Sequence, residues 1–134
     1  MIFLKICSFH LLCCLLSMGI IALNLTFTAY QGVEIAFYIV YSLFITICYF
    51  LFGYKIVITD KISLSFNSQI WLLTIIIIIV SFLDIKMAFF INLPFCTISS
   101  LLYEGIVQNE RTICVITSLL PAALIQIGSV CGMR

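Results

Sequence analysis

The sequence predicts an all-α integral membrane protein with four transmembrane helices and a short interfacial or re-entrant helix before the last span. Of its 134 residues, 65% are hydrophobic and 8% are charged, and the mean hydropathy is +1.36. Soluble domains contain about 25% charged residues, and a small soluble domain leaves too much surface in water to hide this many apolar side chains. We therefore expect residues 1–134 to form a single multi-pass domain surrounded by lipid.

The first two spans are bounded by charged residues. Residues 6–23 follow Lys5, and their apolar run exceeds the core of about 7 to 15 residues that is typical of a signal peptide. Residues 35–54 lie between Glu34 and Lys55. Their length matches a hydrocarbon core of about 30 Å, which requires about 20 helical residues. Both segments are predicted to be transmembrane helices.

The third span, residues 70–91, is interrupted by charge at Asp84 and Lys86. We expect one continuous helix, because fifteen Leu, Ile, Phe or Val residues, at about −0.3 to −0.6 kcal/mol each, offset two charges at about +2.5 to +3.5 kcal/mol each. The alternative ends this helix at Asp84 and begins another span at Met87, which gives five spans in total. The four-span arrangement is favoured, because the extra span would contain Asn92 and Pro94.

Two further segments complete the predicted bundle. Between residues 95 and 108, apolar side chains recur at helical spacing opposite polar ones, so we expect an interfacial or re-entrant helix. The last span covers residues 113–132, after Arg111. Four basic residues fall on one side of this arrangement (Lys5, Lys55, Lys61 and Arg134) and two on the other (Lys86 and Arg111). The positive-inside rule then puts both termini in the cytoplasm, and the plasma membrane is the expected location.

Asp84 and Gln126 are the candidate functional polar residues within the spans, since ionisable groups at membrane depth often mark ion or proton pathways. On a continuous third helix, Asp84 would share a face with Thr74, Ser81 and Asn92, and Gln126 of the last span could be its partner. A structural interpretation competes with this one. In it, Asp84 caps a helix or bonds to a neighbouring helix, and Lys86 extends to the membrane surface.

The last span carries a predicted helix-packing seam of mostly small residues: Ser118, Ala122, Gly128, Ser129 and Gly132, together with Ile125. Gly128 and Gly132 form a G-x-x-x-G motif, which lets another helix approach closely. The spacing does not distinguish a neighbour in the same chain from one in a second copy. This seam is the main sequence feature that points to interaction.

Sequence features that bind metals, cofactors or nucleic acids are not expected here. The seven cysteines include no C-x-x-C pair, and the single histidine, His10, has no second ligand at metal-binding spacing, so it is interpreted as a packing residue. A net charge of +1 gives no reason to expect nucleic-acid binding.

We therefore expect a protein that is not an enzyme. The predicted partners are the bilayer and a second copy or another membrane protein, in an accessory, immunity-type or assembly role. The alternative is an oligomeric transporter of small solutes or ions with Asp84 in its pathway.

Overall fold

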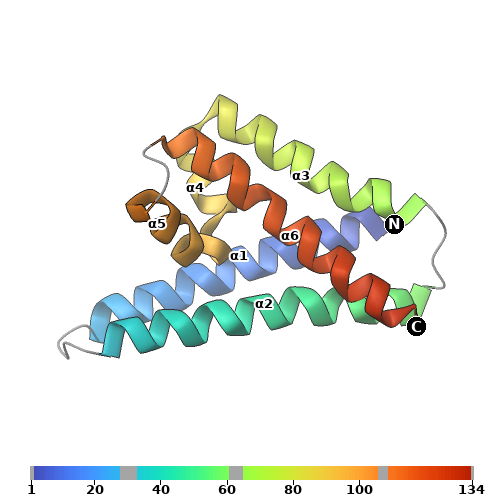
Figure 1. Ribbon diagram of the computed structural model, residues 1–134, viewed down its shortest axis with the longest axis horizontal. Helices are drawn as coiled ribbons and strands as arrows, with labels where there is room; N and C mark the ends of the chain where they lie inside the picture. Colours follow the sequence, from blue (N-terminus) through green and yellow to red (C-terminus); the bar gives the residue numbers. More distant parts are fainter. Residues whose placement is uncertain (1, 28–32, 61–64, 106–108, 134) are drawn as a thin grey trace.

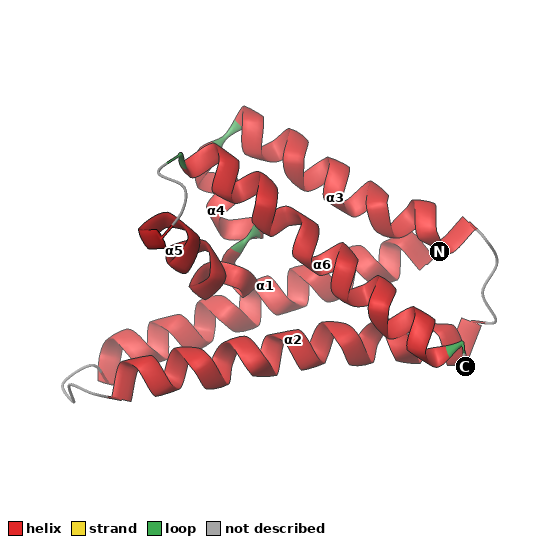
Figure 2. Ribbon diagram, in the orientation of Figure 1, coloured by secondary structure: helices red, strands yellow, loops and turns green. Residues whose placement is uncertain are grey.

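The computed structural model describes residues 2–27, 33–60, 65–105 and 109–133, and these residues are almost entirely helical (Figures 1 and 2). The elements are α1 (Ile2–Phe27), α2 (Val33–Asp60), α3 (Ser65–Leu83), α4 (Ile85–Ile91), the 3-10 helix η1 (Leu93–Phe95), α5 (Cys96–Gly105) and α6 (Glu110–Gly132). The all-α prediction is confirmed for the described residues.

Within the described ranges, three helices are long and apolar enough to cross a membrane: Ile2–Asn24, Ala36–Thr59 and Glu110–Gly132. The predicted spans 6–23, 35–54 and 113–132 lie within α1, α2 and α6. A fourth candidate is the pair Ile85–Ile91 and Leu93–Gly105, which is bent by 68° and has the form of a broken span or a re-entrant loop. The apolar part of α3, Ser68–Leu83, is shorter.

The outer surface of the bundle is rich in large apolar side chains, unlike that of a soluble protein. Large hydrophobic side chains point outward, among them Leu11, Ile75 and Leu83, which is 81% exposed. Several polar side chains are buried alongside the apolar core, including His10, Ser17 and Thr117. In lipid, exposed apolar groups cost nothing and polar groups gain by pairing inside the bundle. The fold is therefore that of a membrane domain.

The prediction of one continuous third helix over residues 70–91 is wrong. The helix ends at Leu83, and Asp84 adopts an extended conformation with φ −145° and ψ 116°. The backbone N–H of Lys86 donates to Asp84 Oδ1 at 2.9 Å, so Asp84 is the N-cap of α4. The transfer of side chains into lipid favours a continuous helix here. The capping preference of Asp favours a break at the same position.

The long helices α1, α2, α3 and α6 extend along the length of the bundle (Figure 1). The outer ends of α1 and α6 lie at the same end of the bundle as the connection from α2 to α3, and α4 and α5 lie towards the opposite end. α2 and α6 are parallel, because Gly128 lies against Phe50 and Gly132, one turn later, lies against Tyr54, also one turn later. Parallel packing of these two helices limits the possible routes through the membrane.

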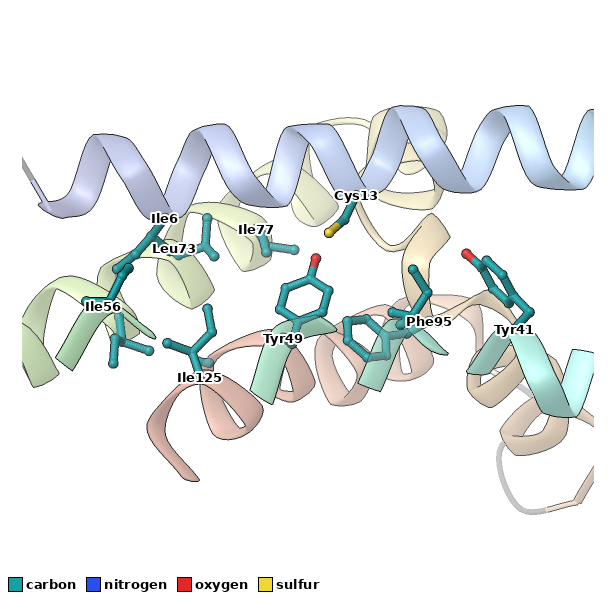
Figure 3. Close-up of a cluster of buried hydrophobic side chains, with 12 residues drawn as sticks. Ile6, Cys13, Tyr41, Tyr49, Ile56, Leu73, Ile77, Phe95 and Ile125 are labelled. Atoms are coloured by element: carbon teal, nitrogen blue, oxygen red, sulfur yellow. The ribbon is translucent and has the colours of Figure 1, made fainter. Parts of the chain in front are cut away.

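The core lies between α1 and the other long helices (Figure 3). Near one end, the ring of Phe9 stacks on Phe52 with a centroid distance of 3.9 Å and meets Tyr49 edge to face at 5.1 Å. Further along, Phe95 of η1 packs against Tyr49 at 5.2 Å. Aromatic side chains thus join α1 to α2, and the break between α4 and α5 lies beside them.

Candidate functional site

The break between α4 and α5 brings several buried polar groups together, among them His10, Asn92 and Thr97. Pro94 has no backbone N–H, so it cannot continue the i→i−4 hydrogen bonds of α4. Proline also disfavours the helical conformation in the residue that precedes it. The N–H of Phe95 donates instead to the Asn92 carbonyl at 3.0 Å, which closes the short turn η1. The Ile91 carbonyl, which a continuous helix would pair with this same N–H, becomes available to other donors.

Two side chains of α1 bind that carbonyl. His10 Nε2 lies 3.0 Å from Ile91 O, and the Cys14 thiol donates to the same oxygen at 3.5 Å. A carbonyl oxygen can only accept, so Nε2 carries a proton. In the neutral imidazole, Nδ1 then accepts from the Tyr49 hydroxyl, which is 2.6 Å away. This chain of hydrogen bonds joins α1, α2 and the break.

α2 binds the other side of the break. The Tyr41 hydroxyl donates to the Leu93 carbonyl at 3.4 Å, and the hydroxyls of Ser42 and Thr97 are hydrogen-bonded to each other. The Cys13 thiol points towards the Tyr49 hydroxyl (Figure 3). We call the set of His10, Cys14, Tyr41, Ser42 and Tyr49 the break clamp.

Asn92 lies within the break, and 4% of its surface is exposed. Its Nδ2 donates to the Ala88 carbonyl at 2.9 Å, which adds a side-chain bond to the end of α4. Its Oδ1 is buried and has no hydrogen-bond partner within the described ranges. The Asn92 side chain therefore adds a hydrogen bond at the C-terminal end of α4, while its Oδ1 receives none from the described residues.

The predicted polar face of the third span is divided by the break at Asp84. Thr74 and Ser81 are buried in α3, where Thr74 Oγ1 donates to the Ser118 carbonyl at 3.5 Å. Asp84 is exposed at the junction of α3 and α4, and the capping interpretation of this residue is correct. Lys86 is exposed as well.

Gln126 does not meet Asp84. Its Oε1 accepts a hydrogen bond from Trp71 Nε1 at 3.0 Å, so it pairs α6 with α3. Trp71 was not singled out in the sequence. The feature of the sequence that could have identified Trp71 is its indole N–H, which needs a hydrogen-bond acceptor when it lies in lipid.

The predicted seam of α6 lies inside the bundle, and its two glycines and Ile125 pack against α2 of the same chain. Ser118, Ala122, Ile125, Gly128 and Ser129 are buried and Gly132 is half-buried. A Cβ atom on Gly128 would lie 2.1 Å from the carbonyl oxygen of Phe50, and one on Gly53 would lie 2.1 Å from that of Ile125. The motif lets two backbones of one chain touch, so a partner helix cannot occupy these residues.

The break clamp was missed in the sequence, where His10 was interpreted only as a packing residue. Asn92-Leu93-Pro94 marked a helix break, and a break in lipid must find donors for its freed carbonyls. His10 and Cys14 are four residues apart on one face of α1, which is the spacing that can deliver two donors to one acceptor.

Metal ligation is not supported in the described part of the chain, since no group of three or more His, Cys, Asp or Glu residues there could hold a metal ion. No protein-family model, curated protein or solved structure matches the chain.

Proposed function

We propose that this protein is a plasma-membrane subunit that acts by interaction, in an accessory, immunity-type or assembly role, and not by catalysis. The observation that carries the proposal is the use of the buried polar groups. His10, Cys14 and Tyr41 all bind backbone carbonyls at the break, and Tyr49 binds His10. These side chains hold the fold together and leave the outer surface as the part of the molecule that meets partners.

We further infer four crossings, made by α1, α2, α3 and α6. α3 has 19 residues and extends about 28 Å, close to the thickness of the hydrocarbon core. The parallel packing of α2 and α6 supports this count. If the bent pair α4 and α5 enters and leaves on one side, α2 and α6 run in the same direction. If that pair crosses in addition to α3, as in the five-span alternative, they run in opposite directions.

The orientation follows from the charges at the two ends. Lys5 and Lys55 belong to the end where α1 begins and α2 ends, together with Lys61 and Arg134 in the sequence. The other end contains more acidic than basic residues: Glu34, Asp84, Glu104 and Glu110, with Lys86 and Arg111. The basic end is expected to face the cytoplasm, with both termini on that side.

Cysteine accessibility tests the route of the chain. Lys86→Cys and Glu104→Cys, each made in a cysteine-free background, should both react with a membrane-impermeant maleimide added outside intact cells. A re-entrant α4–α5 segment brings both positions to the outer surface. Labelling of one from outside and of the other only after permeabilisation would mean that the segment crosses, and the assignment of the four crossings to α1, α2, α3 and α6 would then be wrong.

Transport of small solutes or ions is the competing function, with Asp84 in the pathway. Asp84 instead lies exposed at a helix junction, where its carboxylate is engaged as a cap. We expect purified protein in liposomes to conduct no more ions than empty liposomes do. Saturable flux that Asp84→Asn eliminates would refute the interaction role and establish the transporter.

A further inference from the structure

The hydrogen bond between Trp71 and Gln126 lies at the outer side of the bundle. Trp71 is 39% exposed and Gln126 is half-buried. The indole N–H is a donor only, so it must face the oxygen of the Gln126 amide. This fixes the orientation of the amide and directs its nitrogen, which carries two further donors, away from the indole.

If α6 crosses the membrane as inferred above, those two donors lie within the hydrocarbon core. Gln126 is six residues before Gly132, the last residue of α6, and therefore about 9 Å along the axis from the helix end. A 23-residue helix is only slightly longer than a hydrocarbon core of about 30 Å. No acceptor for Gln126 Nε2 is found among the described residues, and lipid tails offer none.

The surroundings of Gln126 are apolar and open. On the outward side of α6, Leu119 is 41% and Val130 is 48% exposed, and Ala123 provides a small side chain one turn before the amide. We call Trp71, Leu119, Ala123, Gln126 and Val130 the outer α3–α6 face. This face is apolar enough to contact lipid, but it includes one amide group whose N–H donors cannot hydrogen-bond to lipid tails.

We propose that the outer α3–α6 face binds a second copy of this chain through reciprocal Gln126 amides. An amide has two acceptor lone pairs on its oxygen, and Trp71 uses one. The other can accept an N–H from the partner copy's Gln126 while the first copy donates in return. Such an exchange is self-complementary, as a two-fold interface requires. The inference rests on the proposed interaction role and names its partner.

The first test measures association in liposomes by energy transfer between labelled copies over a range of protein-to-lipid ratios. Gln126→Met keeps the length of the side chain and removes the amide, so it should raise the dissociation constant roughly tenfold, as expected for the loss of two interhelical hydrogen bonds. Val130→Trp should also weaken association, by obstructing the face. Leu15→Trp, at an exposed position on α1, is the matched control and should have no effect.

Disulfide cross-linking provides the second readout. In a Cys131→Ser background, Val130→Cys should give a covalent dimer under mild oxidation and Leu15→Cys should not. A wild-type protein that stays monomeric at every lipid ratio would overturn the inference. So would a dimer with unchanged affinity in Gln126→Met. Either result leaves a different membrane partner open, whereas ion flux through the reconstituted protein would refute the interaction role itself.

Discussion

Replacing Gly128 with alanine tests the packing of α2 on α6 directly. The new Cβ would lie 2.1 Å from the Phe50 carbonyl oxygen and 3.1 Å from the Tyr54 nitrogen, and both are backbone atoms that cannot rotate away. Real Cβ contacts essentially never fall below 3.0 Å, so the helices must separate by at least 0.9 Å, the difference between 3.0 and 2.1. A gap of this size forfeits a quarter to a half of the dispersion energy at each affected contact.

We expect Gly128→Ala to lower the free energy of unfolding by about 1 to 3 kcal/mol, the usual cost of overpacking. The measurement is reversible unfolding in mixed micelles with increasing SDS. Gly53→Ala should cost a similar amount, because its Cβ would lie 2.1 Å from the Ile125 oxygen. The double variant should cost less than the sum, because one separation relieves both overlaps.

Gly19→Ala is the matched control for these variants. Gly19 is also helical, but no atom of another part of the bundle lies within 4 Å of the position that its Cβ would take. The substitution should be neutral or stabilising by up to about 1 kcal/mol, through helix propensity alone. If Gly128→Ala and Gly19→Ala had equal stability, the close approach of α2 and α6 would be disproved.

Three further outcomes follow from the break and its surroundings. His10→Leu should lower the unfolding free energy by about 1 to 3 kcal/mol, because the Ile91 carbonyl loses its main donor, and Tyr49→Phe by about 1 kcal/mol; equal stability of His10→Leu and wild type in SDS titration would contradict the clamp. Asp84→Ala should cost about 0.5 to 2 kcal/mol, whereas Asp84→Asn, which still caps, should cost little; equal losses would mean that the charge matters and the cap does not. Ser42→Ala and Thr97→Val should be coupled by about 0.6 kcal/mol in a double-mutant cycle, and strict additivity would rule out their hydrogen bond.

Composition and charge spacing predicted the helical membrane fold and the positions of α1, α2 and α6, because each of these helices needs only a long apolar run. They did not predict the end of α3. At Asp84, a local backbone preference for a cap competes with the insertion of a continuous helix, and the two energies are of similar size. Summing transfer energies over residues 70–91 could not detect that competition.

The candidate site was only partly predictable for a different reason. Gly128 and Gly132 were recognised as contact positions, but their neighbour, α2, lies far away in the sequence, and spacing within one helix does not identify it. Gln126 was recognised as polar, but its partner Trp71 was not. The donors of the break clamp lie 77 and 81 residues from the Ile91 carbonyl that they bind. Such pairings depend on tertiary packing.

The contact between α2 and α6 can form only late in the synthesis of the chain. Seventy-five residues separate Gly53 from Gly128, so at about 5 to 20 residues per second the ribosome needs about 4 to 15 s to make the second glycine after the first. For that interval α2 exists without the helix that packs against its glycine. Since α6 follows every other described helix in the chain, the close contact between α2 and α6 is among the last that can form.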